Sequence, residues 1–590
     1  MSGVLKIMWG RSRWWAASAL MAVVACALLT SLSDAADHPK TIIDLQPFRK
    51  TTSIQIKGAG GKEGLATLIN LNPTINSWYL LQLDWGSGAP QETYHLQNTR
   101  PRTQTLLLEE TNPNGLAIAR GKERSVCDLW GANTRESLKD ARKAAVPYAP
   151  LCGGGAYLRN PTKGHQSPIE KVTDLLREKV PGGEEVVSFV RDTFFARLYQ
   201  KKAEEKVESK PVEGQQQRKP DKGPVPALVN PNQASRVVKA VDLGIDIEDS
   251  DVNNMWPGAW YAAKDNPGIY VSVIVPDGIV PEILRSYPKR VNSLDSVESG
   301  QLVYLIAFDL KQLDLHYSVG TVHPGVGWSG HIPSQMKDKS LPGPDGIDTS
   351  APLIRTGLIN PMDAARIVAA FTGGFKRYHG GFKYGPLSRK NHGSHYGFLE
   401  EGVLFSTLQP ELSTLYVLDD GRADMKTWAG EENNLLQRVR YALQNGVPII
   451  SEFDTAGNVS VPGPSVNRWG EGNWSGSSDE KLRTMRAGAA LQESKKGRFL
   501  IYAFFWSATP SAMARVFQAY QCRYAMLLDM NALVHTYLAV YKKQGSNLYV
   551  QHLIQKMSEV DMTVNGKYIP RFLGYPDDRD FVYLTRKETP

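Results

Sequence analysis

The sequence is poor in cysteine, and this limits the covalent cross-links that are possible. The cysteines are Cys26, Cys127, Cys152 and Cys522. So few cysteines are common in exported proteins. In an oxidising compartment Cys127 and Cys152 could pair, and this pairing is a hypothesis. Cys522 ends an apolar helical pattern and is expected to be a buried thiol.

Several motifs that would identify an enzyme class are also missing. The glycine-rich residues 152–155 lack the lysine and hydroxyl of a phosphate-binding loop, which argues against a nucleotide role. The serines within residues 327–330 and 474–476 lack the spacing of a nucleophile elbow. A serine hydrolase is therefore disfavoured.

The histidines form no recognised metal-binding pattern. His392 and His395 have a spacing compatible with two ligands, but no cysteine or carboxylate triad lies nearby. His316, His323 and His331 are spread through a segment rich in glycine and proline without a zinc spacing. The sequence therefore predicts no metal site and identifies no cofactor.

Basic residues only slightly outnumber acidic residues. The formal net charge is +8 over 590 residues, with a pI of about 9.0. This excess fits a weak attraction to anionic surfaces or glycans and does not indicate nucleic-acid binding. Hydrophobic residues make up 42% of the chain, which is enough for sizeable cores, and the length suggests two to four domains.

The single hydrophobic run long enough to span a bilayer lies at the N-terminus. Residues 14–32 carry no charge, follow three basic residues, and precede a small-x-small pattern that suits cleavage before Ala36. Residues 1–35 are predicted to be a cleaved signal peptide or a retained membrane anchor, with a lipid anchor at Cys26 as a third alternative. Each alternative exports the rest of the chain, so the predicted location is periplasmic, extracellular or anchored to the outer face of the inner membrane.

Residues 40–130 have the alternating pattern of β-strands. Apolar residues alternate within residues 65–71 and 79–85, and further strands are expected around the turn at residues 112–115. We predict a small β-sandwich used for attachment or spacing. The alternative is a carbohydrate-binding module in which an exposed Trp78 or Trp85 stacks on sugar rings.

Two segments separate this region from the rest of the chain. Apolar residues at spacings of three and four predict a helical segment within residues 131–200. Residues 201–232 are dense in Lys, Glu, Gln and Pro, which is the composition of a disordered linker.

Residues 233–590 are predicted to form one α/β domain, a mixed sheet with flanking helices. Residues 270–275 and 302–308 have strand patterns, and residues 415–422 indicate a hairpin. Helices are expected within residues 362–370 and 435–443.

A strand–helix–strand unit organises this domain. Residues 499–506 are a continuous apolar run, typical of a strand buried on both faces. Thr509 and Pro510 mark a helix start, and residues 524–528 form a second buried run. A right-handed crossover makes the two strands parallel, and ligands of such sheets gather beyond the carboxyl ends of the strands. We therefore expect residues 529–535 to lie at the functional site.

Three segments of this domain occur in the order of a known family's motifs. They are residues 369–375 (AAFTGGF), 486–488 (RAG) and 527–531 (LLDMN). With them, residues 265–545 resemble the phosphodiester glycosidase domain, the family of the enzyme that uncovers mannose 6-phosphate by removing N-acetylglucosamine. That family has Asn-Gly-Gly-Phe in the first segment and Leu-Asp-Gly-Gly-Gly-Ser in the last. Here Thr372 replaces the asparagine, and Met530 and Asn531 replace two glycines.

The resemblance implies a pocket for a sugar joined to phosphate. Two glycines expose backbone N–H groups to an anion, and an arginine can hold a phosphodiester oxygen through two N–H groups. The alternatives are a tight turn for the glycines and a surface ion pair for the arginine. The residues predicted to bind substrate are Thr372, Gly373, Gly374, Lys376, Arg377, His379, Arg486, Gly488 and Asn531.

Asp529, His535 and Asp454 are the candidates for catalysis. Asp529 could orient a sugar hydroxyl, bind a cation or serve as acid or base, and the alternative is that it only caps the loop. Imidazole titrates near neutrality, so His535 is the candidate proton carrier. Glycosidases usually use two carboxylates, and Asp454 is the candidate for the second.

Three functions remain open at this point. The leading one is an exported hydrolase that cleaves a sugar-1-phosphodiester in an envelope or extracellular glycan. The second is a family member that has lost catalysis and binds glycan or cell-wall phosphodiesters, which the replaced asparagine and glycines favour. The third is a scaffold of the cell envelope whose N-terminal sandwich does the work. The first two require that the three motif segments meet at one rim of a shared sheet.

Overall fold

The computed structural model describes residues 40–86, 88–131, 137–167, 170–171, 207–212, 223–330, 332–374, 382, 385–390, 396–468, 482–545 and 547–588. The chain divides into two compact units, residues 1–40 and 41–590, and almost all described residues belong to the second. The predicted signal or anchor at residues 1–35 lies outside the described residues. None of the helices in the described ranges is long and apolar enough to cross a membrane.

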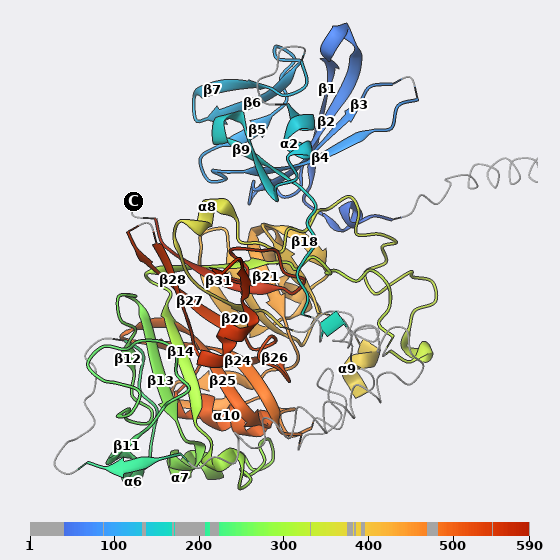
Figure 1. Ribbon diagram of the computed structural model, residues 1–590. Helices are drawn as coiled ribbons and strands as arrows, with labels where there is room; N and C mark the ends of the chain where they lie inside the picture. Colours follow the sequence, from blue (N-terminus) through green and yellow to red (C-terminus); the bar gives the residue numbers. More distant parts are fainter. Residues whose placement is uncertain are drawn as a thin grey trace, which may run out of the picture. The chain divides into compact units, whose positions relative to one another are not determined.

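Antiparallel sheets dominate the second unit, so the predicted α/β fold with flanking helices is wrong (Figure 1). Strands make up 40% of the structure and helices make up 15%. The described α-helices are α2 (Leu138–Lys143), α6 (Pro231–Ala234), α7 (Pro281–Arg285), α8 (Pro361–Ala364), α9 (Gly385–Lys390) and α10 (Pro510–Ala519). The described 3-10 helices are η1 (Ile42–Leu45), η2 (Ala59–Gly61), η3 (Cys152–Gly154), η5 (Pro276–Gly278), η6 (Glu298–Gly300), η7 (Ser334–Met336), η8 (Gly430–Arg438) and η10 (Gln555–Val560).

Two N-terminal sheets share one apolar core. The six-stranded sheet has the order β1-β2-β3-β4-β9-β8 and the three-stranded sheet the order β5-β6-β7. Their strands are β1 (Lys50–Lys57), β2 (Glu63–Asn70), β3 (Trp78–Asp84), β4 (Glu92–Asn98), β5 (Thr105–Leu107), β6 (Gly115–Arg120), β7 (Glu123–Asp128), β8 (Tyr148–Leu151) and β9 (Ala156–Arg159). The strands predicted within residues 65–71 and 79–85 are β2 and β3, which pair antiparallel.

Part of the predicted helical segment belongs to this sheet. In the described part of residues 131–200, α2 is followed by β8 and β9, and residues 172–200 lie outside the description. A disulfide joins Cys127 to Cys152 across the two sheets, with 5.3 Å between the Cα atoms, so the hypothesised pairing is present. Trp78 is 1% exposed beneath the guanidinium of Arg159, 3.5 Å from its ring, and is not available for sugar stacking.

A short strand lies within the predicted linker. β10 (Ser209–Pro211) pairs antiparallel with β11 (Arg236–Val238). Most of the remaining residues between 201 and 222 lie outside the description.

The central sheet has eight strands in the order β12-β13-β14-β25-β24-β26-β22-β23, and all of its ladders are antiparallel. Its strands are β12 (Tyr261–Ala262), β13 (Ile269–Ile274), β14 (Val303–Asp309), β22 (Ile450–Asp454), β23 (Val459–Pro462), β24 (Thr484–Ser494), β25 (Gly497–Ala508) and β26 (Tyr524–Met530). β24 lies between β25 and β26 and is antiparallel to both. β25 and β26 therefore run in the same direction, as predicted, but they are not neighbours.

The strand–helix–strand unit has the burial expected of it. Residues 499–506 are buried on both faces of β25. Thr509 caps α10, because its side chain accepts a hydrogen bond from the Ala512 backbone N–H at 3.2 Å. All ten residues of α10 are buried. Its apolar side chains share one core with β25 and β26.

Two further sheets have five strands each. Their orders are β15-β31-β16-β27-β28 and β18-β17-β21-β19-β20, and β29 and β30 form a separate pair. The strands are β15 (Leu313–Ser318), β16 (Ile367–Thr372), β17 (Phe398–Glu400), β18 (Val403–Ser406), β19 (Ser413–Leu418), β20 (Ala423–Thr427), β21 (Val439–Gln444), β27 (Leu538–Gln544), β28 (Asn547–His552), β29 (Met562–Val564), β30 (Lys567–Ile569) and β31 (Phe581–Arg586). The ring of Phe371 in β16 stacks on Phe308 and contacts Tyr502, so the sheet of β16 packs on the central sheet.

Two predicted helices are largely strands. Residues 362–370 contain only the end of α8 and then enter β16, whereas residues 435–443 comprise the end of η8 and most of β21. Short apolar runs fit the periodicity of a helix as well as that of a strand. Here pairing with neighbouring strands favours the strand. The hairpin predicted at residues 415–422 is present as β19 and β20.

Candidate functional site

The aspartate that the sequence singled out is the last residue but one of β26. Asp529 is 3% exposed, and its Oδ1 accepts a hydrogen bond from the Met530 backbone N–H at 2.8 Å. Asn531 has a φ of 81°, a left-handed conformation that asparagine adopts more readily than most residues. Its backbone N–H donates to the carbonyl oxygen of Met485, and its side-chain oxygen accepts from Thr484 Oγ1, each at 2.8 Å. These contacts fix the loop after β26 onto β24.

One arginine links Asp529 to two other polar side chains. Arg579 Nη1 lies 3.0 Å from Asp529 Oδ2, and Nη2 lies 2.7 Å from His535 Nε2. The third nitrogen, Nε, lies 2.8 Å from Glu170 Oε1. Burial would lower the pKa of Arg579, but the carboxylates of Glu170 and Asp529 raise it above its usual value. The guanidinium is therefore a permanent positive charge in a buried cluster.

The hydrogen bonds of His535 indicate where its proton lies. Nδ1 is 2.7 Å from the carbonyl oxygen of Met530, which only accepts, so Nδ1 carries a hydrogen. Nε2 faces the guanidinium of Arg579, which only donates, so Nε2 is the acceptor. Nε2 also lies 4.0 Å from Glu170 Oε1, so the imidazole is in contact with both the guanidinium and a carboxylate.

Glu170 reaches this cluster from outside the region that resembles the glycosidase domain. Its Oε2 accepts hydrogen bonds from the backbone N–H and the hydroxyl of Ser167, both at 3.0 Å. Burial would raise the pKa of Glu170, but the charge of Arg579 lowers it well below its usual range. One guanidinium therefore holds two carboxylates, Asp529 and Glu170, beside the imidazole of His535.

Thr372 and the two following glycines lie at the end of β16. Thr372 Oγ1 donates to the carbonyl oxygen of His535 at 2.8 Å. The Gly373 backbone N–H donates to the carbonyl oxygen of Asp580 at 2.9 Å, so it is not directed at a ligand. A Cβ on Gly374 would meet no atom closer than 3.5 Å, so space does not require a glycine there. This segment supports the loop that carries His535.

Arg486 has a different role from the predicted phosphate contact. It is 0% exposed and lies opposite Met530 across β24 and β26. Its Nε donates to the carbonyl oxygen of Ala508 at 2.6 Å and its Nη2 to that of Leu482 at 3.0 Å. Its Nη1 lies 2.7 Å from the sulfur of Met530. These contacts make Arg486 a structural residue that satisfies backbone carbonyls behind the loop of Asp529.

Gly488 also has a packing role. A Cβ at this position would lie 2.7 Å from Met513 Cε and 3.0 Å from the Phe517 ring. The glycine therefore lets α10 approach β24 closely.

Asp454 lies away from the cluster. β22 runs antiparallel to β26 with Ile450 opposite Ala525, so the end of β22 is directed away from Asp529. Asp454 is exposed, and its Oδ1 accepts from the Ala456 backbone N–H at 3.0 Å within a turn. The carboxylate that accompanies Asp529 is Glu170, not Asp454.

Other residues singled out by the sequence fall outside the description or have partners elsewhere. Lys376, Arg377, His379, His331, His392 and His395 are not among the described residues. His316 Nε2 lies 2.9 Å from Thr585 Oγ1, and His323 Nδ1 lies 2.7 Å from Asp580 Oδ2. Within the described ranges, no group of three side chains is arranged to hold a metal ion.

The sequence analysis missed Arg579 and Glu170. A signal for Arg579 existed, because the charged run 577–580 directly precedes the apolar strand β31. Charges beside a buried strand require partners. Asp577 pairs with Arg571 at 2.7 Å, and Arg579 pairs within the cluster. For Glu170 no local pattern exists, because its partner lies far along the chain.

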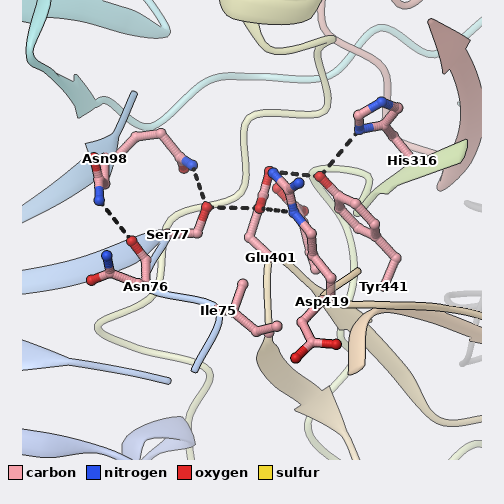
Figure 2. A network of polar contacts seen from close by, with 12 residues as sticks. Ile75, Asn76, Ser77, Asn98, His316, Glu401, Asp419 and Tyr441 are labelled. Carbon is pink, nitrogen blue, oxygen red and sulfur yellow. Dashed lines mark hydrogen bonds and ion pairs between the residues drawn. The ribbon is translucent and has the colours of Figure 1, made fainter. Parts of the chain in front are cut away.

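A second buried polar cluster joins the N-terminal sheet to β21 (Figure 2). Glu401 accepts hydrogen bonds from Ser77 Oγ at 2.8 Å and from Tyr441 OH at 2.6 Å. Arg440 Nε lies 2.9 Å from Glu401 Oε2. Burial would raise the pKa of Glu401, but Arg440 and these hydrogen bonds lower it to about 2. Both carboxylate oxygens have partners, which indicates a structural junction.

No protein-family model matches the chain, and no curated protein matches it either. The resemblance to the phosphodiester glycosidase domain therefore rests on the three motif segments.

Proposed function

We propose that the protein is an exported hydrolase that cleaves a sugar-1-phosphodiester, releasing the sugar and leaving a phosphomonoester. The observation that carries the proposal is the buried contact of Arg579 with Asp529, His535 and Glu170. The three motif segments do not share one sheet as expected, because β16 belongs to the sheet of β31 and β27 whereas β24 and β26 belong to the central sheet. Their ends nevertheless lie close to this cluster. Arg486 in β24 lies opposite Met530 in the neighbouring strand β26, and the Thr372 hydroxyl donates to the backbone carbonyl oxygen of His535.

The chemistry of this substrate suits such a cluster. A phosphomonoester is a stable leaving group. A positively charged side chain that contacts the phosphate therefore assists its departure more than protonation by a general acid does. Arg579 would hold a phosphate oxygen. The Asp529 carboxylate would accept the proton of the attacking water or stabilise positive charge at sugar C1. Water forms the new bond to C1, and the electron pair of the broken C1–O bond leaves with the phosphate.

A protein that binds glycan or cell-wall phosphodiesters without cleaving them is the second candidate. It is favoured by the contacts of Asp529, because Oδ1 accepts from the Met530 backbone and Oδ2 is paired with Arg579. A carboxylate held in this way is a good structural anchor and a weaker base.

The test is release of free sugar from an N-acetylglucosamine-1-phosphodiester by the full chain. Asp529→Asn is expected to lower the rate by about 100-fold or more, since a positioned acid or base contributes roughly that much. Asp454→Asn is the matched control, because it changes an aspartate at the other end of the sheet, and its rate should stay within about twofold.

The outcomes separate the candidates. Release that is unaffected by Asp529→Asn would place the site elsewhere. Binding of the phosphodiester by the wild type without release would establish the binding protein. Neither binding nor release across several envelope glycans would reject both candidates and favour a scaffold.

A further inference from the structure

The segment that carries Glu170 contacts the candidate site. We call residues 161–167, Glu170 and Lys171 the strap. Gly164 donates its backbone N–H to Thr321 Oγ1 at 3.0 Å, and His165 donates its own to the carbonyl oxygen of Pro576 at 2.8 Å. Gln166 Nε2 donates to Asp578 Oδ2 at 2.8 Å. These contacts hold the strap against the charged run 577–580.

The Glu170 carboxylate is the part of the strap that reaches Arg579. Glu170 is 7% exposed and Arg579 is 6% exposed, so their contact is shielded from water. Two of the three nitrogens of Arg579 face Asp529, near the end of β26, and His535, in the loop after it. Among the described contacts of Arg579, only the one made by Nε is with a residue of the strap, Glu170.

We propose that the Nε edge of Arg579 is the phosphate subsite, and that the Glu170 carboxylate occupies it until a phosphodiester takes its place. This inference rests on the proposed function. Carboxylate and phosphate oxygens make the same charge-assisted hydrogen bonds to a guanidinium. They also repel each other, so both cannot share one edge. A bound phosphodiester therefore displaces Glu170, and the empty site is closed by its own chain.

The exchange requires only a local movement. The strap backbone is anchored at Gly164 and His165, and these hydrogen bonds do not involve Glu170. The Glu170 backbone N–H bonds to Ser167 Oγ at 3.2 Å, and that of Lys171 bonds to the carbonyl oxygen of Ser167 at 3.1 Å. Release of the Glu170 side chain would loosen this turn and leave the anchors in place.

The first test is the affinity of the full chain for inorganic phosphate, measured by calorimetry. Glu170→Gln removes the competing charge and keeps the shape, so it should bind phosphate about tenfold more tightly. Glu401→Gln is the matched control, since Glu401 is itself buried and pairs with the Nε of an arginine, Arg440, but lies in the other cluster. Its phosphate affinity should equal that of the wild type. Affinity in Glu170→Gln that is unchanged or weaker would overturn the proposal.

The second test uses the wild type and is independent of any folding defect. Inorganic phosphate should speed hydrogen exchange at the amides of Glu170 and Lys171 and leave those of Gly164 and His165 protected. Phosphate that binds with no change at Glu170 and Lys171 would overturn the exchange. Should Glu170→Gln fail to fold, Glu170→Asp keeps the charge but shortens the reach, and it should bind phosphate more tightly than the wild type.

Sugar release distinguishes failure of this inference from failure of the proposed function. Tighter phosphate binding by Glu170→Gln without sugar release from either protein would keep the subsite and reject the hydrolase. Loss of release in Glu170→Gln with unchanged phosphate affinity would keep the hydrolase. That result would make Glu170 a catalytic carboxylate and overturn its displacement.

Discussion

Thr372 Oγ1 donates a hydrogen bond to the carbonyl oxygen of His535 at 2.8 Å. The bond joins the end of β16 to the loop after β26, and Thr372 is 1% exposed. The threonine stands where the resembling family has asparagine, and its hydroxyl still supplies a donor. The bond is one of several that fix the loop carrying His535, since the backbone N–H groups of His535 and Thr536 also donate to the carbonyl oxygen of Ala532.

Removing that hydroxyl should loosen the site. Thr372→Val keeps the shape but leaves the carbonyl oxygen of His535 without this donor, which should lower the free energy of unfolding by about 1–2 kcal/mol. Urea denaturation measures the change. Thr372→Ser retains the donor, so its free energy of unfolding should fall less than that of Thr372→Val. Equal losses in the two variants would show that the methyl group, and not the hydrogen bond, matters here.

Arg486 should prove important for stability. Arg486→Met would leave the carbonyl oxygens of Ala508 and Leu482 without their donor, at about 1–3 kcal/mol for each buried group. Chemical denaturation should therefore show a large decrease in the free energy of unfolding. Arg483→Met is the control, since Arg483 pairs with Asp295 at the surface and should lose at most about 1 kcal/mol. A stable Arg486→Met protein that no longer binds phosphate would restore the role predicted from the sequence.

The disulfide offers a prediction about the N-terminal sheets. Cys127 and Cys152 are 25 residues apart, and a cross-link over such a loop stabilises a fold by about 3 kcal/mol in the chain-entropy description. The double substitution to serine should lower the melting temperature by several degrees. A chain that begins at Ala36 should show one thiol when denatured without reductant and three after reduction. Equal thiol counts in the two conditions would show that the bond does not form.

Local chemistry accounts for what the sequence predicted correctly. The burial of β25, the Thr509 cap of α10 and the position of Asp529 near the end of β26 each depend on neighbours within a few residues. The shared direction of β25 and β26 also follows from the crossover helix. The sequence did not indicate that β24 separates them, because strand order depends on pairing between distant segments.

The same reasoning explains what the sequence analysis missed. The segment that forms β16 satisfies a helical spacing as well as a strand, and pairing with β27 and β31 settles the difference. Arg486 looked like a ligand because a guanidinium can hold a phosphodiester oxygen through two N–H groups. In the structure its Nε and Nη2 donate to backbone carbonyl oxygens instead. Glu170 and Arg579 form one ion pair across the chain, and no single-sequence pattern predicts such a pair.

His95 should make stability depend on pH from about 6.5 downward, starting above the range in which carboxylates titrate. It is 2% exposed in β4, opposite Arg159 in β9. Burial, and then the charge of Arg159, lower the pKa of His95 from 6.5 to about 3. The unfolded chain therefore binds a proton near pH 6.5 that the folded chain does not accept until about pH 3. The stabilising contribution is complete above pH 6.5 and is lost as the pH falls through this window.

His95→Asn should remove that dependence. Below pH 6 the wild type should lose about 1.4 kcal/mol more per pH unit than the variant, because the two states differ by one bound proton. Urea midpoints at pH 7.5, 6, 5 and 4 measure this. The value at pH 7.5 serves as the control, because His95 is neutral there in both states and any difference reflects packing alone. Parallel curves for the two proteins would mean that His95 is protonated in the folded chain, and that its buried surroundings beside Trp78 and Arg159 accommodate a second positive charge.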